Sequence, residues 1–307
     1  MDLNRAIVRV APCVVLLWLG ACQPPNHYLI HPDQVPDEVF AWAEDTQRGQ
    51  LRIHLEWAKP IGDGPFPTVL VHPEGGKTAN KMKGVIWDLA QQGYLAVAVD
   101  YKRLIDGRYQ RNLFAWRDDS DVTAALDIIS RAIFVDPQRI ATLGFSQGGV
   151  YSLMIAAHAP RRIKAVVAYY PVTDFEYWLN KDRPNAIERF VYRVIRGHFR
   201  RQSGAETEEE FRDSLRRASP LANAELIQAP VLLIHGDSDK AASVQESQRL
   251  ADRLTVLNRE VELIVVPGAV HIFNFRQPEK ATLAWEATLD WLARYLRTNS
   301  YRIHPPS

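Results

Sequence analysis

Short, almost continuous apolar runs recur along the chain, separated by segments whose apolar residues have helical spacing. A strand can be apolar along its whole length only where both faces of its sheet are covered. The runs of this kind are PTVLVH (67–72), YLAVAVD (94–100), RIATLGF (139–145), KAVVAYY (164–170), PVLLIHG (230–236) and VELIVVPG (261–268). The helical segments between them are 79–92, 116–131, 147–159, 244–258 and 278–296. Strand followed by helix, repeated, predicts an α/β fold with a mainly parallel sheet and helices on both faces.

Two regions depart from this rhythm. LRIHLEW (51–57) alternates apolar and polar residues, which is typical of a half-buried strand. Almost sixty residues separate the strand that ends near Pro171 from the one that begins at Pro230, and 174–221 is rich in arginine, glutamate and aromatic residues. An insertion of this length at the edge of a sheet is usually a lid or a partner surface, so we expect helices there.

The overall composition excludes several classes of protein. The chain has 307 residues, of which 47% are hydrophobic and 24% charged, as in a soluble globular protein with an ample core. We expect one domain over residues 46–300, followed by a short tail at 301–307. A net charge of +1 without a basic tail gives no indication of a nucleic-acid partner.

The first residues have the three regions of a secretory signal. Two arginines precede an apolar run over 11–19, which is too short for a comfortable membrane span. The ending Leu19-Gly20-Ala21-Cys22 resembles a bacterial lipobox. The resemblance implies that residues 1–21 are removed and that Cys22 carries lipid. Plain secretion and an uncleaved anchor are the alternatives.

The residues around Cys22 suggest where such a protein would be held. Proline-rich 22–45 is expected to be a tether between the lipid and the domain. The resemblance implies a location in the bacterial cell envelope. Gln23 is not the aspartate that resembles an inner-membrane retention signal, which favours the outer membrane. The other cysteine, Cys13, lies inside the signal, so no internal disulfide and no cysteine metal site is expected in the mature chain.

The sequence Gly-Phe-Ser-Gln-Gly (144–148) stands where a buried strand meets a helix. A serine held on such a tight turn points its oxygen out of the sheet, and the flanking glycines let the chain fold close to itself. The N–H of Gln147, at the start of the helix, would face a developing oxyanion. Ser146 is therefore our candidate nucleophile, although an ordinary Gly-Ser turn would have the same composition.

A serine nucleophile needs a base, and the base needs an orienting acid, in the chain order Ser, Asp or Glu, His. His271 follows a strand and a glycine turn and precedes the last long helix, which makes it the best candidate base. The acid should follow the preceding strand, where Asp237 and Asp239 both stand. The residues alone leave the choice between these two aspartates open.

Three segments together resemble the catalytic domain of the prolyl oligopeptidase group within the α/β-hydrolase superfamily, with dienelactone hydrolase-like enzymes as close neighbours. They are DPQRIATLGFSQGG, ASPLANAELIQAPVLLIHGDSDK and VELIVVPGAVHIFNF, and the likeness covers the chain from about Thr68 onward. The resemblance implies an α/β-hydrolase fold with a helical lid insertion. It also implies that the acid is the aspartate of a His-Gly-x-x-Asp turn, which is Asp239.

The chain departs from that group in three places. The oligopeptidases carry a large β-propeller before the catalytic domain, for which this sequence is expected to leave no room. Gln147 stands where many members have tyrosine. The segment VHPEGGKT resembles the group's oxyanion loop only in part, so the second oxyanion N–H is expected near Glu74 or Gly75.

The insertion contains arginines at helical spacing, Arg189, Arg193, Arg196 and Arg200, with Arg201 beside the last. Such a stripe can be a solvated face, lie against anionic headgroups or receive an acidic substrate.

The whole sequence predicts a lipid-anchored serine hydrolase that needs no metal or cofactor and cleaves an ester or related acyl bond of a small molecule. A prolyl oligopeptidase-type peptidase or aminoacyl hydrolase acting on short peptides is the alternative enzyme. An inactive hydrolase fold that binds an envelope component is the alternative from another class.

Overall fold

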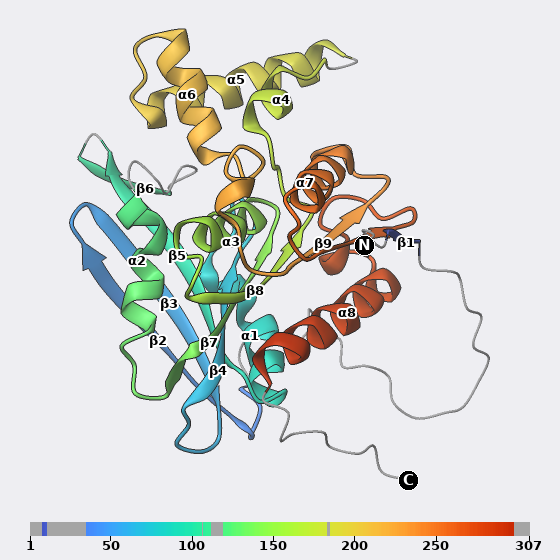
Figure 1. Ribbon diagram of the computed structural model, residues 1–307. Helices are drawn as coiled ribbons and strands as arrows, with labels where there is room; N and C mark the ends of the chain where they lie inside the picture. The colour runs from blue at the N-terminus through green and yellow to red at the C-terminus, as the bar shows by residue number, and fades with distance from the viewer. Residues whose placement is uncertain (1–7, 11–34, 106, 112–118, 183–184, 298–307) are drawn as a thin grey trace.

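The computed structural model describes residues 8–10, 35–105, 107–111, 119–182 and 185–297. Its centre is one twisted sheet with the strand order β1-β10-β9-β8-β7-β4-β5-β3-β2, and β6 pairs with β5 (Figure 1). All pairs from β1 to β5 along this order are parallel, whereas β5/β3, β3/β2 and β5/β6 are antiparallel. The strands are β1 (Val8–Val10), β2 (Val39–Arg48), β3 (Leu51–Pro60), β4 (Phe66–His72), β5 (Leu95–Ile105), β6 (Arg108–Arg111), β7 (Val135–Phe145), β8 (Ile163–Tyr169), β9 (Val231–Gly236) and β10 (Val261–Val266).

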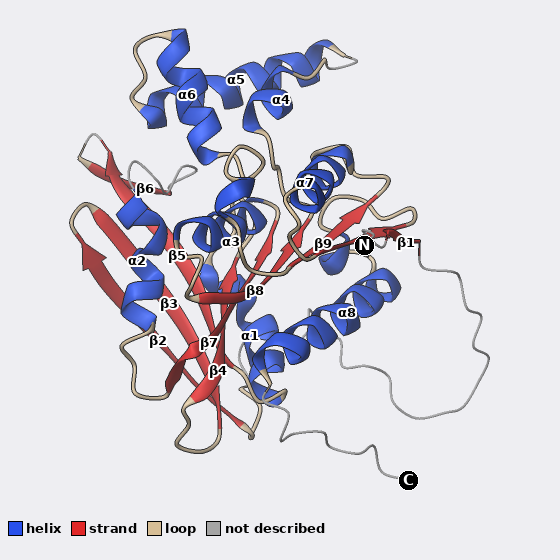
Figure 2. Ribbon diagram, in the orientation of Figure 1, coloured by secondary structure: helices blue, strands red, loops and turns tan. Residues whose placement is uncertain are grey.

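Helices cover both faces of this sheet, as the continuous apolar strands predicted (Figure 2). On one face α2 (Asp119–Ile129), α3 (Gln147–His158) and α7 (Gln245–Val256) contribute to one buried apolar cluster. On the other face α1 (Lys83–Gln91) and α8 (Pro278–Leu296) contribute to the second. Short 3-10 turns lie at Ala79–Met82, Ala224–Leu226 and Phe273–Phe275. The molecule therefore has the α/β-hydrolase architecture, with the carboxyl ends of β7, β9 and β10 at one edge.

The N-terminal boundary of the domain differs from the prediction. We expected a tether up to residue 45, but β2 begins at Val39 and pairs with β3 along its whole length. Trp42 stacks on Trp57 across this hairpin, with ring centroids 5.2 Å apart, so the segment has an aromatic anchor on the sheet. Most β2 residues are exposed or half-buried, and the polar second half of the strand resembles a linker in the sequence.

The predicted insertion is a group of three helices at the carboxyl edge of the sheet, at the top of Figure 1. They are α4 (Phe175–Asn180), α5 (Ala186–Ser203) and α6 (Glu208–Ala218). The Asn185 side chain caps the start of α5, and Thr207 and Glu210 form a capping box at the start of α6. Gly204 ends α5 in the left-handed conformation with φ 70°.

The predicted signal and lipidation site fall mostly outside the described residues. Cys13 and Cys22 are both outside them, and of 1–21 only Val8–Val10 is described, as a strand beside β10. Among the described helices, none has the length and apolar character needed to cross a bilayer.

Candidate active site

Ser146 lies on a sharp turn between β7 and α3. Its φ of 53° and ψ of −114° are unusual for a residue with a side chain. A Cβ on Gly144 would lie 1.9 Å from the Gly148 carbonyl oxygen, and a Cβ on Gly148 would lie 2.0 Å from the His72 carbonyl oxygen. Only glycine fits at either position, and the turn therefore holds Ser146 where β7 ends.

His271 lies in the loop after β10, and its side chain contacts Ser146. Its Nε2 lies 3.0 Å from Ser146 Oγ, the distance of a hydrogen bond. The ring also packs edge-on against the Tyr170 ring, with centroids 4.8 Å apart. Since the His271 side chain is about one-fifth exposed, it is held in place and still accessible from solvent.

The structure separates the two aspartates that the sequence could not. Asp239 Oδ2 lies 2.6 Å from His271 Nδ1, on the side of the ring opposite Ser146. Asp237 instead accepts a hydrogen bond from the Gly268 N–H at 2.7 Å. Asp237 thus fixes the loop that carries His271, whereas Asp239 contacts the histidine itself, as the resemblance implied.

Hydrogen bonds keep Asp239 ionised despite its burial. Burial alone would raise the pKa of its carboxyl. Hydrogen bonds from His235, His271 and the Ala242 N–H outweigh that effect and lower the pKa to about 2. At neutral pH the group next to the His271 ring is therefore a carboxylate, which stabilises a positive charge on that ring.

A second histidine supports the acid and was not predicted to do so. His235, at the end of β9, is completely buried, and its Nε2 lies 3.5 Å from Asp239 Oδ2. The same Nε2 lies 2.8 Å from the Ala242 carbonyl oxygen, so this nitrogen carries a proton. Nδ1 contacts the Ser247 hydroxyl at 2.7 Å. The sequence shows only a histidine at a strand end, with no spacing that reveals this contact.

The helical insertion is attached to the turn that carries the acid. Trp178 Nε1 of α4 and the Tyr192 hydroxyl of α5 both donate to the Ala241 carbonyl oxygen, at 2.7 and 3.2 Å. The N–H of the same peptide group belongs to Ala242 and donates to Asp239 Oδ1 at 2.9 Å. One peptide group therefore joins the insertion to the candidate acid, and no sequence pattern indicates this link.

The loop after β4 lies against the first turn of α3, where Gln147 follows Ser146. A Cβ on Gly75 would lie 3.1 Å from Gln147 Oε1, so the predicted oxyanion residues are indeed neighbours. Glu74 is only 5% exposed, and its Oε2 is buried without a hydrogen-bond partner in the described part of the chain. Burial raises the pKa of Glu74, and nearby Lys77 and His271 oppose this rise only in part.

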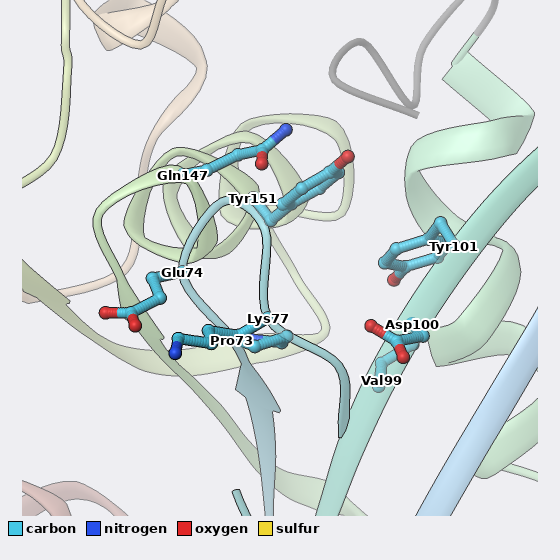
Figure 3. A pocket seen from close by; sticks show the side chains of 8 residues that line it. All are labelled: Pro73, Glu74, Lys77, Val99, Asp100, Tyr101, Gln147 and Tyr151. Atoms are coloured by element: carbon cyan, nitrogen blue, oxygen red, sulfur yellow. The ribbon is translucent and has the colours of Figure 1, made fainter. Parts of the chain in front are cut away.

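A hollow opens beside Gln147, between the loop after β4, the middle of β5 and the start of α3 (Figure 3). Glu74, Lys77 and Asp100 are the charged residues that line it, and Tyr101 and Tyr151 are its aromatic residues. The hollow is small, and Gln147, the residue after Ser146, lies on its wall. Within the described ranges, no group of three or more His, Cys, Asp or Glu side chains could hold a metal ion.

The predicted arginine stripe is partly neutralised by α6. Arg196 pairs with Glu208, and Arg200 Nη1 lies 3.5 Å from the same carboxylate. Arg189 and Arg193, farther from α6 along the helix, are exposed.

Comparison with known proteins relates this geometry to a family. The model of the prolyl oligopeptidase family matches residues 89–299, more than half of the chain. The uncharacterized peptidase YtmA of Bacillus subtilis is 28% identical over 224 residues, 73% of this chain and 82% of that protein. A putative carboxymethylenebutenolidase of Escherichia coli K12 is 26% identical over 285 residues, 85% of this chain and 90% of that protein.

Among solved structures, the acylaminoacyl peptidase of Pyrococcus horikoshii superposes with a TM-score of 0.68 at 18% identity. The match covers 88% of this chain and 43% of the peptidase chain, and it shows a shared fold. The chain belongs to the prolyl oligopeptidase family and is a serine hydrolase of the α/β-hydrolase fold.

Proposed function

We propose that this protein hydrolyses carboxylic esters through an acyl-enzyme formed on Ser146. The observation that carries the proposal is the hydrogen-bonded series Ser146–His271–Asp239, with distances of 3.0 and 2.6 Å. A serine hydroxyl is a poor nucleophile on its own, and this arrangement gives it a base that is oriented and charge-stabilised by an acid.

In the proposed reaction, Ser146 Oγ attacks the substrate carbonyl carbon while His271 Nε2 takes its proton. The tetrahedral intermediate collapses, the bond to the leaving alcohol breaks, and His271 returns the proton to the alcohol oxygen. Water then attacks the acyl-enzyme with His271 again as base, which releases the acid and restores Ser146. The carboxylate of Asp239 holds the ring in position and stabilises the imidazolium in both halves.

The oxyanion of the tetrahedral intermediate needs donors on the other side of the carbonyl. We assign the first to the Gln147 N–H, which follows Ser146 at the start of α3 where the helix dipole favours negative charge. We assign the second to the loop at Glu74 and Gly75, because this loop lies against Gln147. No metal or cofactor takes part in the proposed reaction.

Ester cleavage is favoured by relatives that match along nearly their whole length and are named as a putative carboxymethylenebutenolidase and a probable lactonase. Besides the enzyme of E. coli, a probable 2-oxo-3-(5-oxofuran-2-ylidene)propanoate lactonase of Bradyrhizobium is 25% identical and is covered over 94% of its length. A lactone is an internal ester, so attack of Ser146 on its carbonyl carbon would open the lactone ring by the same reaction.

A specific observation also favours an aminoacyl or peptide substrate. Glu74 and Asp100 bring two carboxyl groups to the hollow beside Gln147 and Lys77 brings one ammonium group, so acidic groups outnumber basic ones there, which would suit a substrate ammonium group. The B. subtilis relative is named as a peptidase, which agrees with this second candidate.

The test uses the full chain with two sets of chromogenic substrates, acyl esters of increasing chain length and aminoacyl or prolyl amides. Ser146→Ala serves as the blank. Ester turnover that disappears in the blank, with amides untouched, supports the first candidate. Amide turnover that disappears in the blank supports the second. No turnover on either set, together with binding of an envelope component that survives Ser146→Ala, would replace both with the inactive binding fold.

We also propose that Cys22 is lipidated and holds the protein in the bacterial cell envelope. The lipobox-like ending at Cys22 supports this proposal. In a bacterial host fed a labelled fatty acid, the protein should carry label and fractionate with membranes. Cys22→Ser should lose the label, and label retained in that variant would contradict the proposal.

A further inference from the structure

Helix α5 presents an exposed apolar face. Ile187, Phe190, Val191 and Val194 are spaced i, i+3, i+4 and i+7, so they lie along one side of the helix. Their exposed fractions are 77%, 64%, 45% and 52%. Large apolar side chains gathered in this way on a surface usually mark an interaction site.

This face points away from the body of the protein. Tyr192 reaches down to the Ala241 carbonyl, and Phe199 packs against Phe175 of α4 at a centroid distance of 5.5 Å. Phe190 is two residues from Tyr192, which is about 200° around the helix. In Figure 1, α5 lies on the outer side of the insertion, far from the sheet. The apolar face is therefore not part of the fold's own core.

Positive charge borders the apolar face. Over its length α5 has five arginines and one glutamate, and two of these arginines, Arg196 and Arg200, lie against Glu208 of α6. Arg193 is three residues from Phe190, and Arg201 is seven residues after Val194, so one borders the apolar stripe and the other extends it. Both arginines are exposed. Glu188, three residues before Val191, borders the stripe on its other side, so the arginines lie along one border and at the C-terminal end. An apolar stripe with arginines in these places is complementary to a surface that is negative outside and apolar beneath.

We propose that α5 binds the surface of an anionic phospholipid bilayer, with Phe190 and its apolar neighbours between the headgroups and the arginines on the lipid phosphates. This contact is additional to any lipid on Cys22 and does not depend on the proposed esterase activity. Because α5 hydrogen-bonds the turn that carries Asp239, it would also orient the candidate active site toward the bilayer.

A second copy of the chain fits this face less well. Two copies packed through this face would bring Arg193 and Arg201 of both copies to one interface, and like charges oppose such contact. An anionic bilayer removes that repulsion and also accepts the apolar side chains.

The experiment places an environment-sensitive dye on the face itself. In the full chain, Cys13→Ser and Cys22→Ser remove the native cysteines, and Val194→Cys takes the dye. Leu283→Cys on α8, which is 63% exposed and distant from α5, is the matched control. Both proteins are titrated with phosphatidylglycerol-containing vesicles and with pure phosphatidylcholine vesicles.

With the anionic vesicles, we expect the emission of a dye at position 194 to shift to the blue and the dye to be protected from an aqueous quencher. The emission of a dye at position 283 should change little. Adding Arg193→Glu and Arg201→Glu should raise the lipid concentration at half-saturation about tenfold or more, since each basic residue near such a surface contributes about 1 kcal/mol.

Three results would overturn the proposal. One is no change at position 194 with anionic vesicles. Another is an equal change at positions 194 and 283, which would mean attachment through the N-terminal segment alone. The third is a shift at position 194 that needs no vesicles and grows with protein concentration, which would identify a second copy as the occupant. Far-UV circular dichroism of each variant checks that it is folded.

Discussion

Helix α5 donates a hydrogen bond to the turn that carries Asp239 through Tyr192 on its inner side, yet this turn and the outer face of α5 are built in opposite ways. Asp239 is 6% exposed, and each of its carboxylate oxygens has two partners, the Ala241 and Ala242 N–H groups on one and the two histidines on the other. On α5, Phe190 is 64% exposed and faces away from the fold. The protein itself supplies all these contacts of Asp239, whereas the exposed apolar side chains of α5 can be covered only by another molecule or a membrane. Substitutions in the turn should therefore change chemistry, and those on α5 should change only where the protein binds.

The largest expected effect comes from removing the charge of Asp239. Asp239→Asn keeps the shape of the side chain but cannot stabilise the His271 imidazolium or hold the same tautomer, so kcat should fall by about 10⁴-fold. Asp237→Asn is the matched control in the same turn, because Asp237 accepts hydrogen bonds from the Gly268 N–H and the Ser238 hydroxyl and not from His271. Steady-state kinetics on the best ester measures both. Similar losses in the two variants would contradict the assignment of the acid.

A smaller effect concerns stability at low pH. The pKa of Asp239 is lowered from 3.8 to about 2, so the unfolded chain takes up this proton before the folded chain does. The carboxylate should contribute about 2 kcal/mol above about pH 4 and lose this contribution as the pH falls toward 2. Urea unfolding at several pH values should show this loss in the wild type. Asp239→Asn should lack this part of the pH dependence, and an identical dependence in both would contradict the low pKa.

Weakening the hydrogen bonds between the helical insertion and the Ala241 carbonyl should lower kcat less than removing the charge of Asp239. Trp178→Phe removes the indole N–H that donates to Ala241 O, leaving Tyr192 in place. One neutral hydrogen bond is worth about 1 kcal/mol, so kcat should fall by about threefold to tenfold while KM for a short soluble ester stays unchanged.

Trp291→Phe is the matched control for this link, because Trp291 Nε1 is buried without a hydrogen-bond partner in the described chain. A loss of thermal stability without any change in kcat for Trp178→Phe would mean that the link is structural only.

The smallest effect is expected on the outer face of α5. Phe190→Asp removes an exposed apolar side chain that makes no contact with the catalytic turn, so the free energy of unfolding should change by about 0.5 kcal/mol or less. The kcat/KM for a soluble ester should also stay the same. A large loss of activity without vesicles would show that this face takes part in the reaction itself.

The sequence predicted the sheet and Ser146 because each depends on local patterns. Strands such as β8 are apolar on both faces, and glycines flank the serine at fixed spacing. Helix α8 was predicted with its observed bounds. Strand β2 was missed because its second half is polar and its anchor, Trp42 on Trp57, is a contact between strands.

The parts that could not be predicted depend on tertiary contacts. Asp237 and Asp239 stand two residues apart in one turn, and only the position of the neighbouring loop decides which of them meets His271. His235 gives no sign of its contact with Asp239 because the bend of the chain after β9 creates it. The arginines of α5 were visible, but the pairing of Arg196 with α6 requires the packing of the insertion.

The peptide group between Ala241 and Ala242 limits how this protein could be redesigned. Exchanging residues 174–221 for the insertion of another hydrolase would leave Ser146, His271 and Asp239 untouched in sequence. It would still remove both donors to the Ala241 carbonyl, since Trp178 and Tyr192 lie within the exchanged segment. A chimaera intended to change only the substrate range would therefore also change the hydrogen bonds that position Asp239. It would avoid this only if the grafted segment brought two donors to the Ala241 carbonyl oxygen.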